Sequence, residues 1–505
     1  PRLTGRQINA ASITLSVDGQ TIAAVPGESI AAAMTAAGLR QLREDRLGKP
    51  RGLFCGMGAC FECRVSIDGG PPQRACLTPV RPSLSVRTIQ YREPVPASQP
   101  DSRELETETI RCDVLVIGAG PAGATAACEL AAAGRNVVVL DERRDAGGQY
   151  FKQMIAAVSA SGPDDRQYRE GRNLIERLQR SPARLIAGAT AWGAFRTASG
   201  QLEIAASAGQ AAYRIQAGEL IAATGAYESV PPFPGWTLPG VMTTGAAQSL
   251  VRAYRVAPGR KVLIAGNGPL NLQLACELVR AGVDVVAVAE SAPAPLPGRA
   301  LAAAAAFAAS PSLMLRGLGY LARLRRHGVP VLFGHHVHSA KRDAGLVEAA
   351  VAPLDDSGRL SDKAAKRFSA DALCLGYRQV PSSELLRALG SEAEILPTGA
   401  PAARRDSVGR TNLPGVYAIG DGGTPGGAQV AAIEGKLLAD AMLGNNADHG
   451  RMRRLNRHRR FQQNLWTLFH APTPSSLTDA DTTVCRCESV NAETLRKLVR
   501  GGVRD

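Results

Sequence analysis

The sequence is poor in aromatic residues and contains no long apolar run. Phe, Trp and Tyr make up 4% of its 505 residues, so the stacking side chains of a nucleic-acid groove are scarce and the net charge of +14 predicts no nucleic-acid partner. The longest apolar stretch, from Leu301 to Ala309, is half of the roughly 18 residues that cross a bilayer, so no transmembrane segment is expected. The N-terminus shows no basic segment followed by an apolar one, and the expected location is therefore cytoplasmic.

The length predicts several folding units. At about 150 residues per domain, 505 residues correspond to three or four. The densest basic cluster lies in a helix-like stretch and comprises Arg451, Arg453, Arg454, Arg457, Arg459 and Arg460. We expect it to form a solvated face or a face that contacts a partner subunit.

The ten cysteines fall into distinct groups. In a reducing compartment they are expected to be thiols or metal ligands rather than disulfides. Four of them lie singly in apolar patterns and are predicted to be small core residues: Cys112, Cys128, Cys276 and Cys374. The other six form one group of four near the N-terminus and one pair near the C-terminus.

The group of four has the spacing of an iron–sulfur site. Its members are Cys55, Cys60, Cys63 and Cys76, in the pattern C-x4-C-x2-C…C. This spacing suits a [2Fe–2S] cluster, and glycines at 56 and 58 let the loop amides approach the sulfurs. The alternative is structural zinc, which usually takes two separated C-x2-C pairs.

The surrounding segment predicts a small mixed domain. Residues 12–17 and 20–25 alternate as two strands around the turn dipeptide Asp18-Gly19, and a helix follows from about Ile30 to Ala37. Over residues 12–90 the sequence resembles the β-grasp ferredoxin domain of small iron–sulfur subunits. We predict this domain at 1–91 and a Pro-rich linker at 92–110.

A dinucleotide-binding pattern begins at Cys112. A buried strand to Ile117, a glycine-rich turn, a helix to Gly134 and a second strand are expected. The glycines permit a tight turn and close approach to a pyrophosphate, and an acid about twenty residues on accepts the ribose hydroxyls. The candidate residues are Gly118, Gly120, Gly123, Asp141 and Glu142.

A second such pattern starts at Lys261. Its candidate residues are Gly266, Gly268 and Glu290, but Asn271 replaces the third glycine. The pattern predicts either a site for NAD or another adenine nucleotide, or a Rossmann unit kept for architecture.

Further segments point to FAD in the first site. Ala223-Thr224-Gly225 ends a strand, and Gly420-Asp421 ends another before a helix through Gln429. Here the sequence resembles the two-dinucleotide-domain flavoproteins of the glutathione-reductase superfold, over about residues 111–444. The resemblance implies an α/β fold in which two Rossmann-like domains interleave: FAD domain at 111–230 and 372–445, inserted nucleotide domain at 231–371.

This resemblance also assigns roles within the first site. It favours Glu142 over Asp141 for the ribose, adds Gln149 after the Gly147-Gly148 turn, and gives Asp421 a hydrogen bond from the flavin's ribityl chain. Disulfide reductases of the superfold carry a close cysteine pair beside the flavin, and this sequence has none there. Dithiol chemistry is therefore not expected, and the chain itself offers no candidate catalytic residue.

The C-terminal pair, Cys485 and Cys487, lies in a predicted module at 446–505. The sequence from Thr482 resembles the start of a bacterioferritin-associated-ferredoxin-like module, which binds a second [2Fe–2S] cluster with two further cysteines some thirty residues later. Since the sequence stops at Asp505, the expectation is either a shortened sequence or an incomplete cluster. The alternative is a free dithiol.

The order of these parts resembles one family of flavoprotein subunits. It includes those of hydrogen cyanide synthase, opine oxidases, hydroxyproline or proline dehydrogenases, and the large subunit of heterotetrameric sarcosine oxidase. The resemblance implies an electron-transfer subunit whose partner, a smaller subunit resembling D-amino-acid oxidase with its own FAD, oxidises an amine or amino acid. It leaves room for a downstream electron acceptor and for a further small subunit. The alternative is a self-sufficient NADH-dependent reductase.

One apparent metal site is given little weight. His335, His336 and His338 follow an apolar run in a strand-like stretch without a nearby carboxylate or cysteine. A solvated or subunit-facing strand is the favoured interpretation.

Overall fold

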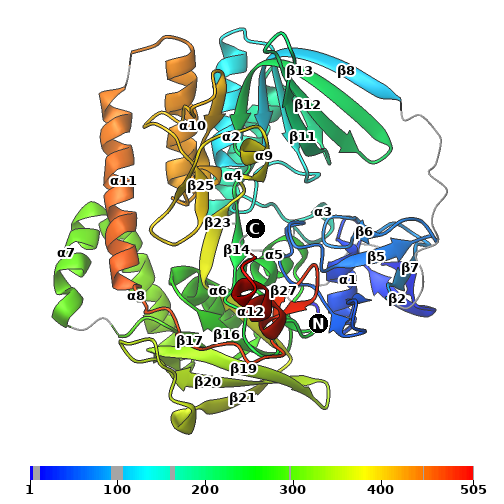
Figure 1. The fold of residues 1–505 in the computed structure, drawn as a ribbon, viewed down its shortest axis with the longest axis vertical. Helices are drawn as coiled ribbons and strands as arrows, with labels where there is room; N and C mark the ends of the chain where they lie inside the picture. Colours follow the sequence, from blue (N-terminus) through cyan, green and yellow to red (C-terminus); the bar gives the residue numbers. More distant parts are fainter. Residues whose placement is uncertain (4–11, 92–105, 160–164, 295–296, 447, 504–505) are drawn as a thin grey trace.

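The computed structural model describes residues 1–3, 12–91, 106–159, 165–294, 297–446 and 448–503. Figure 1 shows an N-terminal unit beside two larger α/β domains, with the C-terminal segment crossing in front of them. No helix in the described ranges is both long and apolar enough to span a bilayer.

The N-terminal unit is a mixed sheet that holds one helix. Its strand order is β2-β1-β7-β5-β6, with β1 parallel to β7 and antiparallel to β2. The Ser29 hydroxyl accepts the amide of Ala32 and starts α1, whose residues from Ile30 to Thr35 are all buried. The elements are β1 (Ile13–Val17), β2 (Gln20–Ala24), α1 (Ile30–Ala36), β3 (Arg43–Glu44), β4 (Pro50–Arg51), β5 (Arg64–Ile67), β6 (Gln73–Arg74) and β7 (Ser85–Thr88).

A buried ion pair closes the turn between β3 and β4. Arg51 donates to Asp45 at 2.5 Å, and both side chains are inaccessible to solvent. Although burial raises the pKa of Asp45, hydrogen bonds from the Lys49 amide, Arg51 and the Leu47 amide lower it further, and the net shift is downward. The depressed pKa means that this contribution to stability is present above the ordinary aspartate pKa and is lost as pH falls through the folded value.

Replacing Asp45 by asparagine should therefore destabilise the N-terminal unit strongly. The change leaves Arg51 buried without its counter-charge, and breaking such pairs costs about 3–5 kcal/mol. The measurement is urea unfolding followed by near-UV circular dichroism. The matched control is Asp68→Asn, whose pair with Arg81 is exposed and worth about 0–1 kcal/mol. Equal losses in the two variants would contradict the prediction.

The first large domain is built on a seven-stranded sheet. Its order is β10-β9-β8-β13-β12-β11, with β26 added on β13; β8 lies parallel to both β9 and β13. Helices α2 and α10 pack together on one face, where Gly435 approaches the Ala122 backbone closely. The elements are β8 (Thr107–Ile117), α2 (Pro121–Ala132), β9 (Val137–Asp141), α3 (Ala156–Ser159), α4 (Arg166–Arg180), β10 (Arg184–Ala187), β11 (Thr190–Arg196), β12 (Leu202–Ala208), β13 (Ala211–Ala222), β26 (Val416–Ala418), η3 (Gly420–Gly422) and α10 (Ala428–Met442).

Strand β8 begins earlier than the sequence predicts. The expected linker ran to 110, but Thr107 already pairs with Ala212 on β13. Exposed residues can join the ladder because backbone hydrogen bonds, not side-chain burial, hold this end of the strand. Residues 92–105 of the predicted linker lie outside the described ranges.

The inserted domain has a parallel sheet in the order β15-β22-β16-β17-β18 and a separate antiparallel sheet β19-β20-β21. The elements are β15 (Val241–Thr243), α5 (Thr244–Tyr254), β16 (Lys261–Gly266), α6 (Pro269–Arg280), β17 (Asp284–Glu290), η1 (Pro297–Arg299), α7 (Ala300–Ala309), α8 (Pro311–Arg326), β18 (Val331–Phe333), β19 (His335–Asp343), β20 (Leu346–Pro353), η2 (Asp362–Ala364), β21 (Lys366–Ala370) and β22 (Ala372–Gly376).

The predicted boundary at 371 needs correction. Strand β22 begins at Ala372 and pairs with both β15 and β16, so it completes the inserted sheet instead of returning to the first domain. All five of its residues are buried. An apolar strand fits either parallel sheet equally well, and only the pairing places it.

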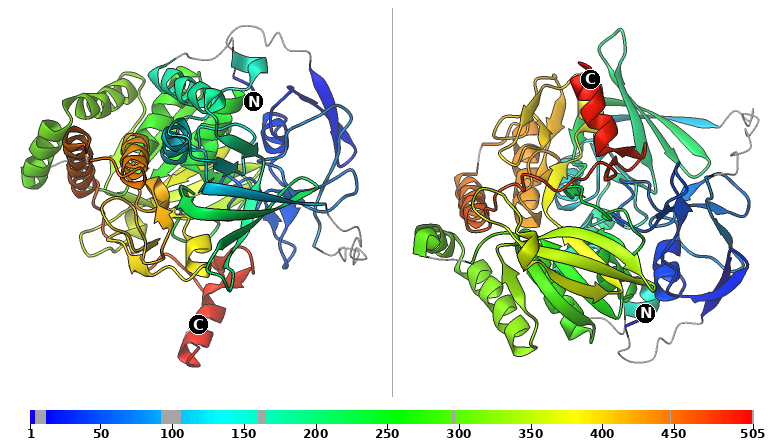
Figure 2. Two further views of the ribbon diagram at one scale, coloured as in Figure 1. Left: turned by 90° about the horizontal axis from the view of Figure 1, so that it is seen from above. Right: turned by 60° about the horizontal axis from the view of Figure 1, so that its bottom comes forward.

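The crossover and the C-terminal part complete the chain. The two passages between the large domains pair with each other as β14 and β23. Helix α11 packs against α7 and α10, and α12 projects from the body (Figure 2). The elements are β14 (Ala226–Ser229), β23 (Arg378–Pro381), α9 (Glu384–Ala388), β24 (Ala393–Ile395), β25 (Pro401–Ala403), α11 (His449–Leu468), β27 (Thr483–Cys485), β28 (Val490–Asn491) and α12 (Ala492–Arg500).

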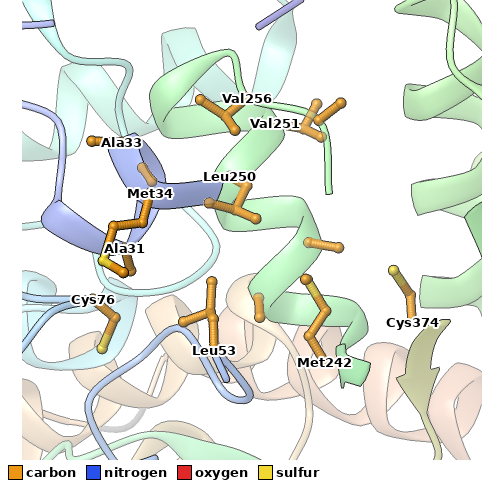
Figure 3. Close-up of a cluster of buried hydrophobic side chains, with 14 of the residues drawn as sticks. Ala31, Ala33, Met34, Leu53, Cys76, Met242, Leu250, Val251, Val256 and Cys374 are labelled. Atoms are coloured by element: carbon orange, nitrogen blue, oxygen red, sulfur yellow. The ribbon is translucent and has the colours of Figure 1, made fainter. Parts of the chain in front are cut away.

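The N-terminal unit shares a hydrophobic core with the inserted domain. Figure 3 shows Met34 on α1 and Leu53 on the cysteine loop facing Leu250 on α5, in one continuous buried cluster. The unit is thus packed on the inserted domain as well as joined by the chain, and its orientation is defined by that contact.

Candidate cofactor sites

The four N-terminal cysteines come together on one loop and the start of the next. Cys55, Cys60 and Cys63 lie between β4 and β5, and Cys76 follows β6. All four are free thiols. They form two contacting pairs, Cys55 with Cys60 and Cys63 with Cys76. The Cys60 thiol and the amides of residues 57, 59 and 60 lower the pKa of Cys55 to about 6.

This arrangement fits a two-iron cluster better than a single metal ion. In the described ranges no group of three or more His, Cys, Asp or Glu side chains is placed around one ion, whereas the two cysteine pairs offer two thiols at each of two positions. Amides directed at a thiol sulfur, such as Met57 N at 3.5 Å from Cys55 Sγ, stabilise thiolate ligands. Gly56 is required because a Cβ there would lie 2.9 Å from the Cα of Ala246 on α5.

The first dinucleotide pattern opens onto a cavity of about 620 Å³ between the domains. The predicted residues on its wall are Gly118, Gly120, Asp141, Glu142, Gln149, Thr224, Gly420 and Asp421. Gly118 has a φ of +104°, and a Cβ would lie 2.3 Å from the Ala223 carbonyl oxygen. Gly123 lies behind the wall and lets α2 approach β8, since its Cβ would meet the Gly118 carbonyl oxygen. Gln429 is exposed and is not part of the wall.

The two candidate acids have different surroundings. Asp141 is buried and accepts the amides of Ala119 at 2.6 Å and Arg143 at 2.8 Å, and burial raises its pKa. Both Asp141 oxygens thus already hold the turn. Glu142 lies on the cavity wall with Arg74 as its partner at 3.2 Å. These contacts agree with the prediction that Glu142 is the ribose acceptor, which stays a prediction.

Asp421 and Thr224 shape the far side of the cavity. One Asp421 oxygen accepts the amides of Gly426 and Gly427 just before α10, at 2.8 and 3.0 Å. Burial raises the pKa of Asp421. The Thr224 hydroxyl donates to the Ser382 carbonyl at 2.5 Å, which joins the two ends of the crossover.

The structure adds wall residues that the sequence did not reveal. Met57 and Ala59 of the cysteine loop line the same cavity. So do Lys152, which donates to Ser249, and Glu228, which accepts the Gly245 amide at 2.9 Å while its other oxygen has no partner. Burial raises the pKa of Glu228 to about 7. None of these residues belongs to a motif, so no sequence signal marks them.

Arg74 connects the two sites directly. It donates to the Gly58 carbonyl of the cysteine loop, to Glu142 and to the Thr190 hydroxyl, at 3.1 to 3.2 Å. The cysteine loop and the cavity therefore share both a wall and a bridging side chain.

The second dinucleotide turn is covered by the chain itself. The Asn267 amide nitrogen donates to the Phe469 carbonyl at 2.8 Å, and Trp466 lies 3.9 Å from where a Cβ of Gly268 would be. Glu290 is buried, accepts the amides of Gly268 and Ala292, and has a pKa raised to about 7 by burial. Asn271 fills the place of the third glycine and donates to the Gly376 carbonyl.

The C-terminal cysteines lie near the first cysteine loop. Cys485 ends β27 and is half-buried, and Cys487 is exposed. Burial of Cys487 and the neighbouring Cys485 raise its pKa.

The histidines form no metal site in the described structure. They lie on β19 as predicted, but His336 is buried against Tyr377, contrary to a solvated strand, and burial lowers its pKa to about 4. The Arg cluster of α11 is partly internal as well. Arg459 pairs with Glu434 on α10, and Arg451 pairs with Asp440.

Fold and site together define a two-dinucleotide-domain flavoprotein with an iron–sulfur unit. Residues 112–435 match the family described as pyridine nucleotide-disulphide oxidoreductase, and residues 10–91 match the 2Fe-2S iron-sulfur cluster binding domain. The chain belongs to the pyridine nucleotide-disulphide oxidoreductase family and, within it, is an oxidoreductase related to the flavoprotein subunits of opine oxidases.

Three comparisons show how far these likenesses extend. The chain is 32% identical to the A-type subunit of opine oxidase from Agrobacterium tumefaciens, over 77% of this chain and 79% of that protein. It is 30% identical to the HcnB subunit of hydrogen cyanide synthase from Pseudomonas aeruginosa, over 77% and 86%. The crystal structure of L-proline dehydrogenase from P. horikoshii has the same fold, with a TM-score of 0.68 and 20% identity over 99% of this chain and 87% of that one.

Proposed function

We propose that this chain is the electron-transfer subunit of a multi-subunit dehydrogenase or oxidase acting on amino acids, opines or related secondary amines. The first cavity holds FAD, and Cys55, Cys60, Cys63 and Cys76 hold a [2Fe–2S] cluster. The observation that carries the proposal is the shared wall: Met57 and Ala59 of the cysteine loop line the FAD cavity. A flavin accepts two electrons as a hydride and can release them singly, and a [2Fe–2S] cluster takes one at a time.

The chain's own residues have positioning roles in this proposal. The turn at Gly118 and the start of α2 receive the pyrophosphate, and Glu142 receives the ribose. Arg74 fixes the cysteine loop against this site. The buried pocket of Lys152 and Glu228 lies on the wall beside the cysteine loop and keeps charged groups near the isoalloxazine side.

Substrate oxidation is assigned to a partner. The similar proteins are named as subunits, of opine oxidase and hydrogen cyanide synthase, and this supports a partner chain. We propose a smaller FAD subunit resembling D-amino-acid oxidase, together with a separate electron acceptor and a further small subunit.

The second dinucleotide domain is proposed to be architectural. Its turn is covered by residues 466–469, and Asn271 occupies the space that close helix packing on a dinucleotide would need. NAD binding there would require the end of α11 to move. The inserted domain instead provides α5, on which the iron–sulfur unit packs.

The test compares the chain alone with the chain co-purified with its co-encoded partners. Proline, sarcosine and an opine are offered with an artificial electron-accepting dye, and NADH is offered separately with stopped-flow detection of the flavin. We expect no dye reduction by the chain alone, reduction by the complex with one of the amines, and no rapid bleaching by NADH. Dye reduction by the chain alone would overturn the assignment of substrate oxidation to a partner, and rapid bleaching by NADH would replace it with an NADH-dependent reductase.

A further inference from the structure

The residue between the two C-terminal cysteines is buried against the cysteine loop. Arg486 is 8% exposed, and its guanidinium lies 3.6 Å from the ring centre of Phe54, the residue before Cys55. It also lies 4.6 Å from the Trp236 ring centre. Such stacking on aromatic faces holds a guanidinium in a fixed orientation.

Several contacts anchor this C-terminal segment. The Trp236 indole donates to the Thr483 carbonyl at 2.7 Å, and Arg486 donates to the Trp236 carbonyl at 3.4 Å. At the segment's exposed edge, Arg46 pairs with Glu488 at 2.8 Å. The segment is thus held on both sides of Arg486, although it is more than 400 residues away in sequence from the loop it covers.

The charges around the loop do not balance. Glu62, which lies between Cys60 and Cys63, is fully buried and pairs with Arg43 at 2.9 Å. Asp45 pairs with Arg51. Arg486 approaches Glu62 only at 3.4 Å, shares that carboxylate with Arg43, and its Nε has no hydrogen-bond partner. Three buried guanidinium groups therefore face two carboxylates, and the third is Arg486.

The excess charge lies beside the cysteines. Arg486 interacts electrostatically with Cys60 and favours its thiolate form. A cluster held by four thiolates carries a negative charge that grows by one on reduction, and net charge and hydrogen bonding around such clusters set their reduction potentials. A buried cation stabilises the reduced form most because little solvent screens it.

We propose that Arg486 is a positioning residue that raises the reduction potential of the cluster on Cys55, Cys60, Cys63 and Cys76, and that the Cys485–Cys487 segment delivers this charge by covering the cysteine loop. The inference rests on the proposed function, since it requires that cluster. It also places Cys485 and Cys487 next to the first cluster, at the side facing away from the shared core in Figure 3.

The test is a redox titration of the full chain with its cluster, followed by electron paramagnetic resonance. At the potential where the unaltered protein is half reduced, Arg486→Gln should lower the ratio of reduced to oxidised cluster about tenfold, which corresponds to ~59 mV for one electron. Glu62→Gln should raise that ratio because it removes a buried negative charge. Arg486→Lys should retain most of the unaltered ratio.

The matched control is Arg496→Gln, which removes an equal charge from the exposed face of α12, where Arg496 bonds only to Thr478. It should leave the potential unchanged. A positive shift or none in Arg486→Gln, or an equal shift in the control, would overturn the proposal. If Arg486→Gln loses its cluster, Glu62→Gln still tests the sign, and a ratio that stays or falls would overturn it. Failure of the unaltered chain to assemble a cluster would contradict the proposed function instead.

Discussion

Replacing Cys63 by serine should abolish the iron–sulfur chromophore and leave the flavin bound. Cys63 is buried and contacts Cys76, so its loss removes one of the two thiols at that position. A hydroxyl is a much poorer ligand for iron than a thiolate, and we expect at least a tenfold fall in iron per chain. The measurement is iron and acid-labile sulfide per chain, with the visible spectrum recorded on the same sample.

The control for this prediction is Cys276→Ala. Cys276 is equally buried but lies on α6, in the core of the inserted domain, away from the other cysteines. It should keep full iron content, because a small apolar residue there serves packing alone. Unchanged iron in Cys63→Ser, or an equal loss in Cys276→Ala, would refute the assignment of Cys63 as a ligand. Loss of flavin together with iron would show instead that the cluster is needed to shape the shared wall.

Replacing Gly118 by alanine should cost the chain its FAD. The added Cβ would lie 2.3 Å from the Ala223 carbonyl oxygen, and the φ of +104° is unfavourable for any residue with a side chain. Either strand β8 or the Ala223 turn must move, and both line the cavity. We expect flavin content after desalting to fall at least tenfold, measured by absorbance per chain.

A second glycine separates the clash from backbone strain. Gly188 also has a positive φ, of +72°, but a Cβ there meets nothing within 4 Å. Gly188→Ala should lose only about 1–2 kcal/mol of stability and retain its flavin. If both variants retain flavin, the cavity does not bind it at the Gly118 turn. If both lose it, strain rather than close approach explains the effect.

Much of the fold could be read from local patterns. The turn at Asp18-Gly19, strand β9 and helix α6 form where alternation, apolar runs and glycine stops predict them. These features depend on the chain's local geometry, since a buried parallel strand needs a continuous apolar run and a dinucleotide turn needs glycine. The two matched families cover the same two segments that the motifs indicated.

Pairing between distant segments could not be read in this way. The sequence of β22 suits a buried strand in either sheet, and the predicted boundary at 371 was wrong because only hydrogen-bond register chooses between them. The predicted place of Gln429 on the cavity wall stays without support, since the start of α10 turns it outward. A one-residue change of helix phase is enough to do this, and a motif does not specify the phase.

The sequence by itself determined the chemistry of this protein: four cysteines at iron–sulfur spacing, a complete dinucleotide fingerprint and the absence of a flavin-side dithiol. Those properties depend on residue type and short spacing. The tertiary structure alone decided how the parts work together. It brought Met57 to the cavity wall, joined Arg74 to Glu142, and placed Arg486 beside Glu62. Each of these contacts joins residues at least 68 positions apart or from separate elements, and such contacts follow from how whole domains pack, which no local pattern encodes.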